Sequence, residues 1–329
     1  MKTFKKLFAF VLTLVLALSF VSCGNSESTE NKEETAKKNI GIIQFGSHAS
    51  LNNCYDGIIK GLEESGINLE ECNIELLNSN FDPSVSQSQA NTLVNKKVDV
   101  IIAIATPSAV AAANAAADKD IPVVYCAITD ASVMENYTNI TGASDIPDFD
   151  KQLEVVTGFM GKDDVKIGVL YSTEESSSPI QVENLKKAAD SYEGMEILDS
   201  AVSDITTIDA KTTELVERGV DCFVNLLDNT IVGKLETNIL PITNEKKIPV
   251  FGSEIEQVKV GCVASASIEY VNVGKLSGET AAQILKGEKK ADEIPVQKVT
   301  DPENYYNSKA CEKLGLKVPA DVTATDVAE

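Results

Sequence analysis

A series of short apolar runs and longer helical patterns occurs twice in this chain, in the same order. The first copy contains the strand-like runs IGIIQF, NIELLNS, VDVIIAIA and IPVVYCAI, and the second contains IGVLYS, MEILDSAV, VDCFVNLL and IPVFG. A helical pattern separates each run from the next, which is typical of βαβ units and a parallel sheet. The openings IG, VD and IPV recur in register. The duplication therefore predicts an α/β fold with two similar doubly wound parallel-sheet lobes.

The segment after the second copy predicts that the chain recrosses between the lobes. It contains the run GCVASASIEY and a helical pattern over 273–286, and it does not repeat the series. We therefore assign residues 39–145 plus about 271–292 to an N-terminal lobe, and residues 146–270 plus about 293–329 to a C-terminal lobe, joined by crossover strands. The first crossing is expected near 142–147. Because ligands of doubly wound sheets bind beyond the carboxyl ends of the strands, two facing lobes would share one cleft.

The N-terminus has the pattern of an export signal. Three lysines precede an apolar run over residues 7–20, and the string FVSC ends at Cys23. The run is shorter than the roughly 20 residues that span a bilayer, so we predict a cleaved signal peptide over residues 1–22. FVSC resembles the bacterial lipobox, which implies lipidation of Cys23. An ordinary secretory signal and an uncleaved anchor are the alternatives. Residues 23–38 are strongly polar and are expected to form a lipidated N-terminus with a flexible linker.

Charge and composition exclude several classes of function. The net charge of −21 argues against binding to nucleic acid or to anionic lipid. His48 is the one histidine, which excludes a multi-histidine metal site, and no CxxC pair indicates zinc or redox chemistry. No GxSxG elbow, Walker loop or GxGxxG turn is present. We therefore expect a monomeric binding protein, not an enzyme, with free thiols, no metal and no cofactor.

Polar residues follow the predicted strands at the ends where a shared cleft would lie. In the first copy these candidate ligand-binding residues are Ser47, His48, Thr106, Ser108, Thr129 and Asp130. In the second copy they are Glu175, Ser177, Ser178, Asp228, Asn229, Thr230 and Glu254. Three of them, Ser108, Ser178 and Asp228, have an alternative interpretation as helix N-caps. Their convergence on one rim favours a ligand site.

Several strings carry a resemblance to a known family. IATPSA, AITD, LLDNT and GKLSGETAAQILKGEK resemble ABC-transporter solute-binding lipoproteins, and in particular the tryptophan- and tyrosine-binding (TrpX-like) proteins. The resemblance implies a type I periplasmic-binding-protein fold, a location on the outer face of the cell membrane or in the periplasm, and a membrane permease as partner. It also implies ligand contacts from Thr106, Thr129, Asp130, Glu175, Ser178, Asp228 and Asn229.

The charges of the candidate rim indicate what kind of solute it could hold. Arg218 is the one arginine and lies away from every predicted strand end, so hydroxyls and helix N-termini would have to hold a carboxylate. Four acidic residues offer more negative charge than a neutral ligand needs, and this favours an ammonium group. Together these features indicate an amino acid, and the resemblance favours an aromatic one. A nucleoside- or sugar-binding lipoprotein of an importer, or a ligand sensor for a membrane receptor, remains an alternative.

Overall fold

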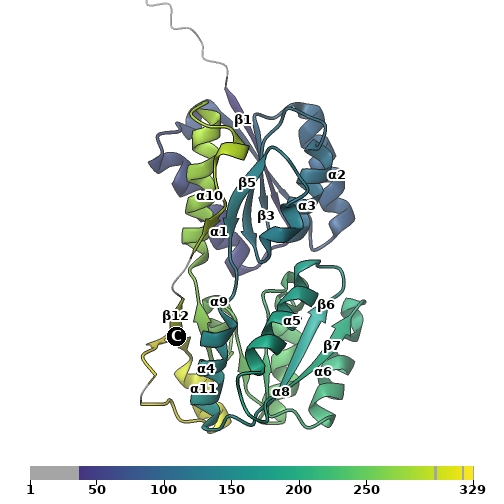
Figure 1. The fold of residues 1–329 in the computed structure, drawn as a ribbon, viewed down its shortest axis with the longest axis vertical. Coiled ribbons are helices and arrows are strands. Elements are labelled where there is room, and N and C mark those ends of the chain that lie inside the picture. Colours follow the sequence, from purple (N-terminus) through teal and green to yellow (C-terminus); the bar gives the residue numbers. More distant parts are fainter. Residues whose placement is uncertain (1–36, 300–301, 321, 329) are drawn as a thin grey trace, which may run out of the picture. The chain divides into compact units, whose positions relative to one another are not determined.

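The computed structural model describes residues 37–299, 302–320 and 322–328 (Figure 1). The predicted signal peptide, the lipidation site at Cys23 and the linker up to residue 36 lie outside the described residues. Within the described ranges, no helix has the length and apolar character needed to cross a membrane. The described chain forms two lobes, each built on its own parallel sheet.

The first lobe contains a six-stranded parallel sheet in the order β11-β5-β4-β3-β1-β2. Its strands are β1 (Lys38–Gln44), β2 (Cys72–Asn78), β3 (Val100–Ile104), β4 (Val123–Ile128), β5 (Ile140–Ser144) and β11 (Gln297–Lys298). Its helices are α1 (Ala49–Glu64), α2 (Pro83–Lys96), α3 (Thr106–Ala116) and α10 (Tyr270–Leu285), with short turns η1 (Leu69–Glu71), η2 (Ala131–Met134) and η5 (Ala291–Glu293).

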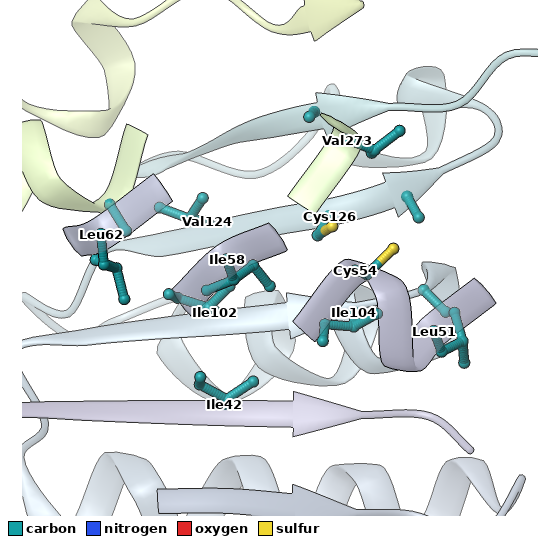
Figure 2. Close-up of a cluster of buried hydrophobic side chains, with 14 of the residues drawn as sticks. Ile42, Leu51, Cys54, Ile58, Leu62, Ile102, Ile104, Val124, Cys126 and Val273 are labelled. Carbon is teal, nitrogen blue, oxygen red and sulfur yellow. The ribbon is translucent and has the colours of Figure 1, made fainter. Parts of the chain in front are cut away.

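Successive side chains of each strand point to opposite faces of the first sheet, so a hydrophobic core forms on each face. Ile40 and Ile42 of β1 pack with residues of α1 and α10, whereas Ile43 packs on the opposite face with residues of α2 and α3. Figure 2 shows the first of these cores, in which Ile58 of α1 lies near Ile102 of β3. Because helices cover both faces, the central strands are apolar at nearly every position, as the sequence predicts for buried parallel strands.

Helices α1 and α10 pack against each other through glycines. A Cβ atom at Gly57 would lie 2.1 Å from the carbonyl oxygen of Val271, and one at Gly274 would lie 2.1 Å from the carbonyl oxygen of Cys54. A second glycine on each helix, one turn further on, repeats this close contact. The missing side chains let the two backbones touch. The N-terminal ends of both helices are thereby held at a fixed spacing.

The second lobe repeats the strand order of the first. Its four-stranded parallel sheet has the order β7-β6-β8-β9, which corresponds to β2-β1-β3-β4 and confirms the duplicated fold. Its strands are β6 (Lys166–Ser172), β7 (Glu196–Val202), β8 (Cys222–Val224) and β9 (Val250–Phe251). Its helical segments are α4 (Phe149–Met160), α5 (Ser177–Ala189), η3 (Ile205–Thr207), α6 (Ile208–Glu217), α7 (Asn229–Val232), the π-helical η4 (Leu235–Ile239), α8 (Leu240–Glu245), α9 (Ile255–Lys259) and α11 (Ser308–Leu314).

The strand order of each sheet shows where the direction of the crossover connections reverses, which is called the switch point. In the first sheet β1 lies between β2 and β3, and in the second β6 lies between β7 and β8. Ligand sites of doubly wound sheets form beyond the carboxyl ends of such central strands. The loops that follow β1, β3, β6 and β8 are therefore the segments placed to form a site.

One detail of the crossings differs from expectation. The first crossing follows β5 and begins at Asp145, within the expected range of 142–147. The strand β11 pairs with β5, so residues 297–298 lie in the first sheet although we assigned the chain from about 293 to the C-terminal lobe. This difference arises because backbone pairing with β5 is a long-range contact, which local sequence periodicity does not report.

A third, small sheet joins segments that the duplication does not predict. The strand β10 (Ala264–Ser267) pairs antiparallel with β12 (Glu303–Tyr306), which in turn pairs with β13 (Thr325–Asp326). The strand β10 also lies beside β9, since the amide N–H of Gly252 donates to the carbonyl oxygen of Ala264 at 2.9 Å. The last part of the chain is thus attached to the second lobe.

Candidate functional site

A cavity lies where strand ends and helix N-termini of both lobes meet. It contains about 320 Å³ of empty space, counting the part that is open to solvent. On the first lobe its walls come from α1, the ends of β4 and β5, and α10, and on the second lobe from the segment after β8, α7 and α9. Five of the predicted residues line it, namely His48, Thr129, Asp228, Asn229 and Glu254.

A chain of hydrogen bonds crosses from the first lobe to the second at this cavity. Nε2 of His48 lies 3.1 Å from Oδ1 of Asn229, and Nδ2 of Asn229 donates to Oε2 of Glu175 at 2.9 Å. Oε1 of Glu175 accepts from the backbone N–H of Thr230 at 2.8 Å and from its hydroxyl at 3.1 Å. Glu175 and Thr230, both predicted, therefore hold the position of Asn229.

A second hydrogen bond joins the lobes close to the first. Nδ2 of Asn53, on α1, donates to Oε1 of Glu256, on α9, at 3.1 Å. The neighbouring Glu254 caps α9, since its carboxylate accepts from the backbone N–H groups of Glu256 and Gln257. The N-terminal parts of α1 and α9 thus face each other across the cavity.

Of the three residues that had an alternative interpretation as helix N-caps, only Asp228 is an N-cap. Asp228 caps α7 by accepting from the backbone N–H of Ile231 at 3.0 Å, and it also accepts from the N–H of Ser172 at 2.5 Å. Ser108 and Ser178 lie inside the first turns of α3 and α5, where they are fully buried and their hydroxyls have no partner in hydrogen-bonding geometry. They are therefore not N-caps.

The remaining predicted residues lie outside the wall of the cavity. Thr106 and Ser177 are buried in the first turns of α3 and α5. Ser47 is exposed in the loop before α1. Asp130 caps the short turn η2 by accepting from the backbone N–H of Ser132 at 2.8 Å. Each follows a strand as predicted, but none of the four is among the residues that line the cavity.

The sequence analysis missed a buried pair in the cavity wall. The hydroxyl of Tyr270, at the start of α10, donates to Oδ2 of Asp145 at 2.6 Å. Oδ1 of Asp145 is buried and has no partner in hydrogen-bonding geometry. Asp145 directly follows β5, so its position after a strand was a usable signal, although we interpreted that segment only as a crossing. Tyr270 gave no such signal because it begins a helix.

Other parts of the wall are also contributed by residues outside the predicted set. Ser50 and Leu51 belong to the first turn of α1, Gln257 to α9, and Leu227 to the segment after β8. Ala127 lies at a β-bulge, where the register between β4 and β5 shifts, and its φ of 58° is uncommon for a residue with a side chain. Bulges are frequent beside functional sites because they redirect the chain.

The cavity is acidic, and burial opposes the charged forms of its carboxyl groups. Burial raises the pKa of Glu254 to about 7 and raises the pKa values of Asp145 and Asp228. Behind the wall, burial and the neighbouring charge of Asp228 raise the pKa of Glu175 to about 8. Among the described residues of the wall there is no Lys or Arg. A cationic group entering the cavity would therefore meet carboxyl groups that lack a counter-charge.

Burial also keeps the imidazole neutral. It lowers the pKa of His48, and this effect outweighs the opposing effect of the hydrogen bond with Asn229. His48 therefore supplies no positive charge to the cavity near pH 7. Among residues 37–299, 302–320 and 322–328, no three His, Cys, Asp or Glu side chains are grouped in a way that could hold a metal ion.

Two solved structures at about 30% identity resemble this two-lobed arrangement. A domain from Streptococcus pneumonia in complex with L-Trp superposes with a TM-score of 0.81 at 32% identity, covering 87% of this chain and 97% of that one. A ligand-free, open substrate-binding protein with adhesive properties from Clostridium difficile gives a TM-score of 0.65 at 31% identity, covering 89% of this chain and 100% of that one. The fold and site thus define a two-lobed solute-binding protein.

The sequence assigns the family within that class. The model of the ABC transporter substrate binding protein family matches residues 39–327, and the chain belongs to this family. A tyrosine-binding protein of Clostridioides difficile (strain R20291) is 34% identical over 333 residues, which cover 96% of this chain and 94% of that protein. The expected fold and the expected role as the substrate-binding component of an ABC transporter are confirmed.

Proposed function

We propose that the protein captures an amino acid, with an aromatic one favoured, between its two lobes and delivers it to the permease of an ABC importer. The observation that carries this proposal is the acidic cavity between the lobes, whose described wall includes Asp145, Asp228 and Glu254 but no basic residue. An ammonium group is the natural partner for such a wall, because a buried carboxylate without a counter-charge is unfavourable.

The first turn of α1 supports binding of the carboxylate of the same ligand. The N-cap residue His48 makes no side-chain hydrogen bond to the first turn, and that turn contains no acidic residue. Ser50 and Leu51 of this turn line the cavity, and the Ser50 hydroxyl has no partner in hydrogen-bonding geometry. Free N–H groups at a helix N-terminus bind anions. One cavity therefore offers places for both charged groups of an amino acid.

The names of two relatives support the choice of an aromatic amino acid. The relative with 34% identity is a tyrosine-binding protein, and the structure with 32% identity contains L-Trp. At nearly equal identity, the TM-score is 0.81 against the L-Trp complex and 0.65 against the open, ligand-free protein. We infer that the described arrangement corresponds to the closed state, which the ligand must bind better than the open one.

We also propose the location that the sequence predicts, and the predicted lobe boundaries with the last one moved from about 293 to 298 to include β11 in the N-terminal lobe. Cys23 would carry the lipid that anchors the protein to the outer face of the membrane, and the linker up to residue 38 would let the lobes reach the permease. The lobes would divide near residues 145, 270 and 298. Mass spectrometry of the mature N-terminus, with the Cys23→Ser variant as control, tests the anchor.

Calorimetric titration with matched analogues tests the ligand. We expect L-tyrosine and L-tryptophan to bind, and we expect both tyramine, which lacks the carboxylate, and 3-(4-hydroxyphenyl)propionate, which lacks the amine, to bind at least tenfold more weakly. The Asp228→Asn variant should lose affinity. Asp99→Asn, the same change at an exposed position directly before β3, away from the cavity, should not. Failure of every amino acid to bind, while a sugar or nucleoside binds, would overturn the proposal.

A further inference from the structure

We propose that the side chain of the bound amino acid lies in a second, larger cavity, and that Leu227, Ile146 and Phe149 on its wall select for a large, mainly apolar side chain. This inference rests on the proposed function, since it concerns the same ligand. It identifies the residues that would distinguish one amino-acid side chain from another.

The larger cavity adjoins the acidic one. It contains about 1650 Å³ of empty space by the same measure, and Asp145 and Leu227 line both cavities. The acidic cavity is much the smaller of the two, with about 320 Å³. Because the two spaces share these wall residues, we treat them as two compartments of one cleft.

The two compartments differ in chemistry. Most side chains that line the smaller one are polar. The larger one has charged residues, among them Lys151, Lys187 and Lys298, but it also has an apolar wall formed by Ile146, Phe149, Ile268 and Leu227. Ile146 is 43% exposed, which places a large apolar side chain in a hollow where the described structure leaves it uncovered. A ligand side chain packed there would bury apolar surface that is otherwise in contact with water.

Asp145 lies at the junction of the compartments and directs the ligand. Its Oδ2 accepts from the Tyr270 hydroxyl at 2.6 Å, which leaves the buried Oδ1 without a partner. An ammonium group that bonds to Oδ1 places the α-carbon at the junction, because amino group and side chain share that carbon. An apolar side chain then extends into the larger compartment, since the smaller one is lined by polar groups that it would leave unpaired.

The wall at Leu227 is held rigidly. Its backbone N–H donates to Oε1 of Gln181 at 3.0 Å, and its carbonyl oxygen accepts from Nε2 of the same residue at 2.9 Å. Gln181 is itself buried in α5. Because this wall is already fixed, it loses little further conformational entropy when a ligand packs against it.

A third cavity, which is also lined by residues of both lobes, is a poorer place for the side chain of the ligand. It contains about 1180 Å³ of empty space and is lined by Phe81, Ile205 and Gly233, among others. It shares no described lining residue with the acidic cavity. Its Ile205 is 39% exposed, so this residue provides a matched control for Ile146.

Affinities of L-tyrosine, L-tryptophan and L-alanine for the unchanged protein and for Ile146→Ala and Ile205→Ala test the inference. We expect Ile146→Ala to weaken both aromatic ligands about three- to tenfold and to leave L-alanine within twofold. Ile205→Ala should change none of the three. Both residues are exposed, and urea unfolding curves should coincide with that of the unchanged protein. Ile146→Trp, which places a bulkier side chain in the larger compartment, should weaken L-tryptophan the most.

Each alternative outcome has a distinct meaning. If the Ile146 variants weaken L-alanine as much as L-tyrosine, or if only Ile205→Ala weakens L-tyrosine, the side chain does not lie in the larger compartment, and the proposed function stands without it. If L-alanine binds too weakly to measure, the comparison of the two variants with L-tyrosine decides the question. If the unchanged protein binds none of the three amino acids, the proposed function fails and this inference fails with it.

Discussion

Nε2 of His48 lies 3.1 Å from Oδ1 of Asn229, and this contact joins residues 181 positions apart on different lobes. Because Nδ2 of Asn229 donates to Glu175, the amide presents its oxygen to His48, and Nε2 therefore carries the imidazole proton. The ring of Phe81 stacks on His48 with 6.2 Å between the ring centres and 5° between the planes. The contact thus requires a proton on Nε2, and the imidazole is held on two sides.

Replacement of His48 by alanine should shift the ligand-free protein toward the open state. The loss of one partly buried hydrogen bond corresponds to about 1 kcal/mol, or about fivefold in the ratio of closed to open molecules. Small-angle scattering should show a larger radius of gyration, and ligand affinity should fall by a similar factor. Asn53→Ala, which removes the second contact between the lobes, should act in the same direction. A scattering curve that is unchanged in both variants would show that these bonds do not hold the lobes together.

Stability should fall as the pH rises from about 4.5 to about 8. A carboxyl group whose folded pKa lies above its unfolded value binds more protons in the folded state within that window, so the free energy of unfolding decreases with pH. Glu175, with a pKa of about 8, and Glu254, with a pKa of about 7, both act in this direction. Each contributes a slope of at most about 1.4 kcal/mol per pH unit.

The Glu175→Gln variant isolates one of these two contributions. Urea unfolding at several pH values should show a flatter dependence between pH 5 and 8 than in the unchanged protein. Glu174→Gln removes the same charge from the exposed neighbouring residue and provides the control. Equal slopes for both variants would mean that Glu175 does not titrate in this range.

Binding of an amino acid should release protons near neutral pH. Before binding, Glu254 is partly protonated, and it shares the cavity with Asp145, Asp228, His48 and Tyr270. An ammonium group favours the carboxylate form, so the pKa of the carboxyl falls and its proton leaves. Affinity should therefore rise between pH 5 and 8. Titration calorimetry in phosphate and in Tris should give different observed enthalpies, and identical enthalpies would contradict proton release.

Alanine at Gly57 or Gly274 should destabilise the first lobe. The added Cβ would lie 2.1 Å from a carbonyl oxygen of the facing helix, so the helices would have to separate. Overpacking of this kind typically costs about 1–3 kcal/mol. Gly158→Ala, in α4, meets only a side-chain carbon at 3.3 Å and should change stability little. Urea midpoints compare the three variants, and equal midpoints would show that α1 and α10 tolerate the separation.

The strands of the two parallel sheets were predictable because buried parallel strands leave a strong local pattern. The runs that become β1 and β6, and those that become β3 and β8, are apolar and β-branched, which indicated two doubly wound lobes. The strands β12 and β13 were not predictable. They are short, and their pairing, of β12 with β10 and of β13 with β12, is a long-range contact that leaves no local pattern.

The site was predictable in outline and not in its contacts. The pattern of a polar residue after a strand selected His48, Asn229 and Glu254, which line the cavity. The same pattern also selected Ser47 and Asp130, which do not line it, since loop conformation is not encoded in strand periodicity. The pairing of Asp145 with Tyr270 depends on the path of α10, 125 residues later in the chain.

The backbone contact between α1 and α10 has a consequence for any attempt to redesign the protein. His48 and Ser50 near the start of α1 and Tyr270 at the start of α10 all face the cavity, and the glycines bind the two helices into one unit. Movement of one helix to suit a new solute would carry the other with it and displace three contacts at once. An engineer who wants a biosensor for another molecule would keep this helix pair as a fixed frame and diversify the loops after β5 and β8.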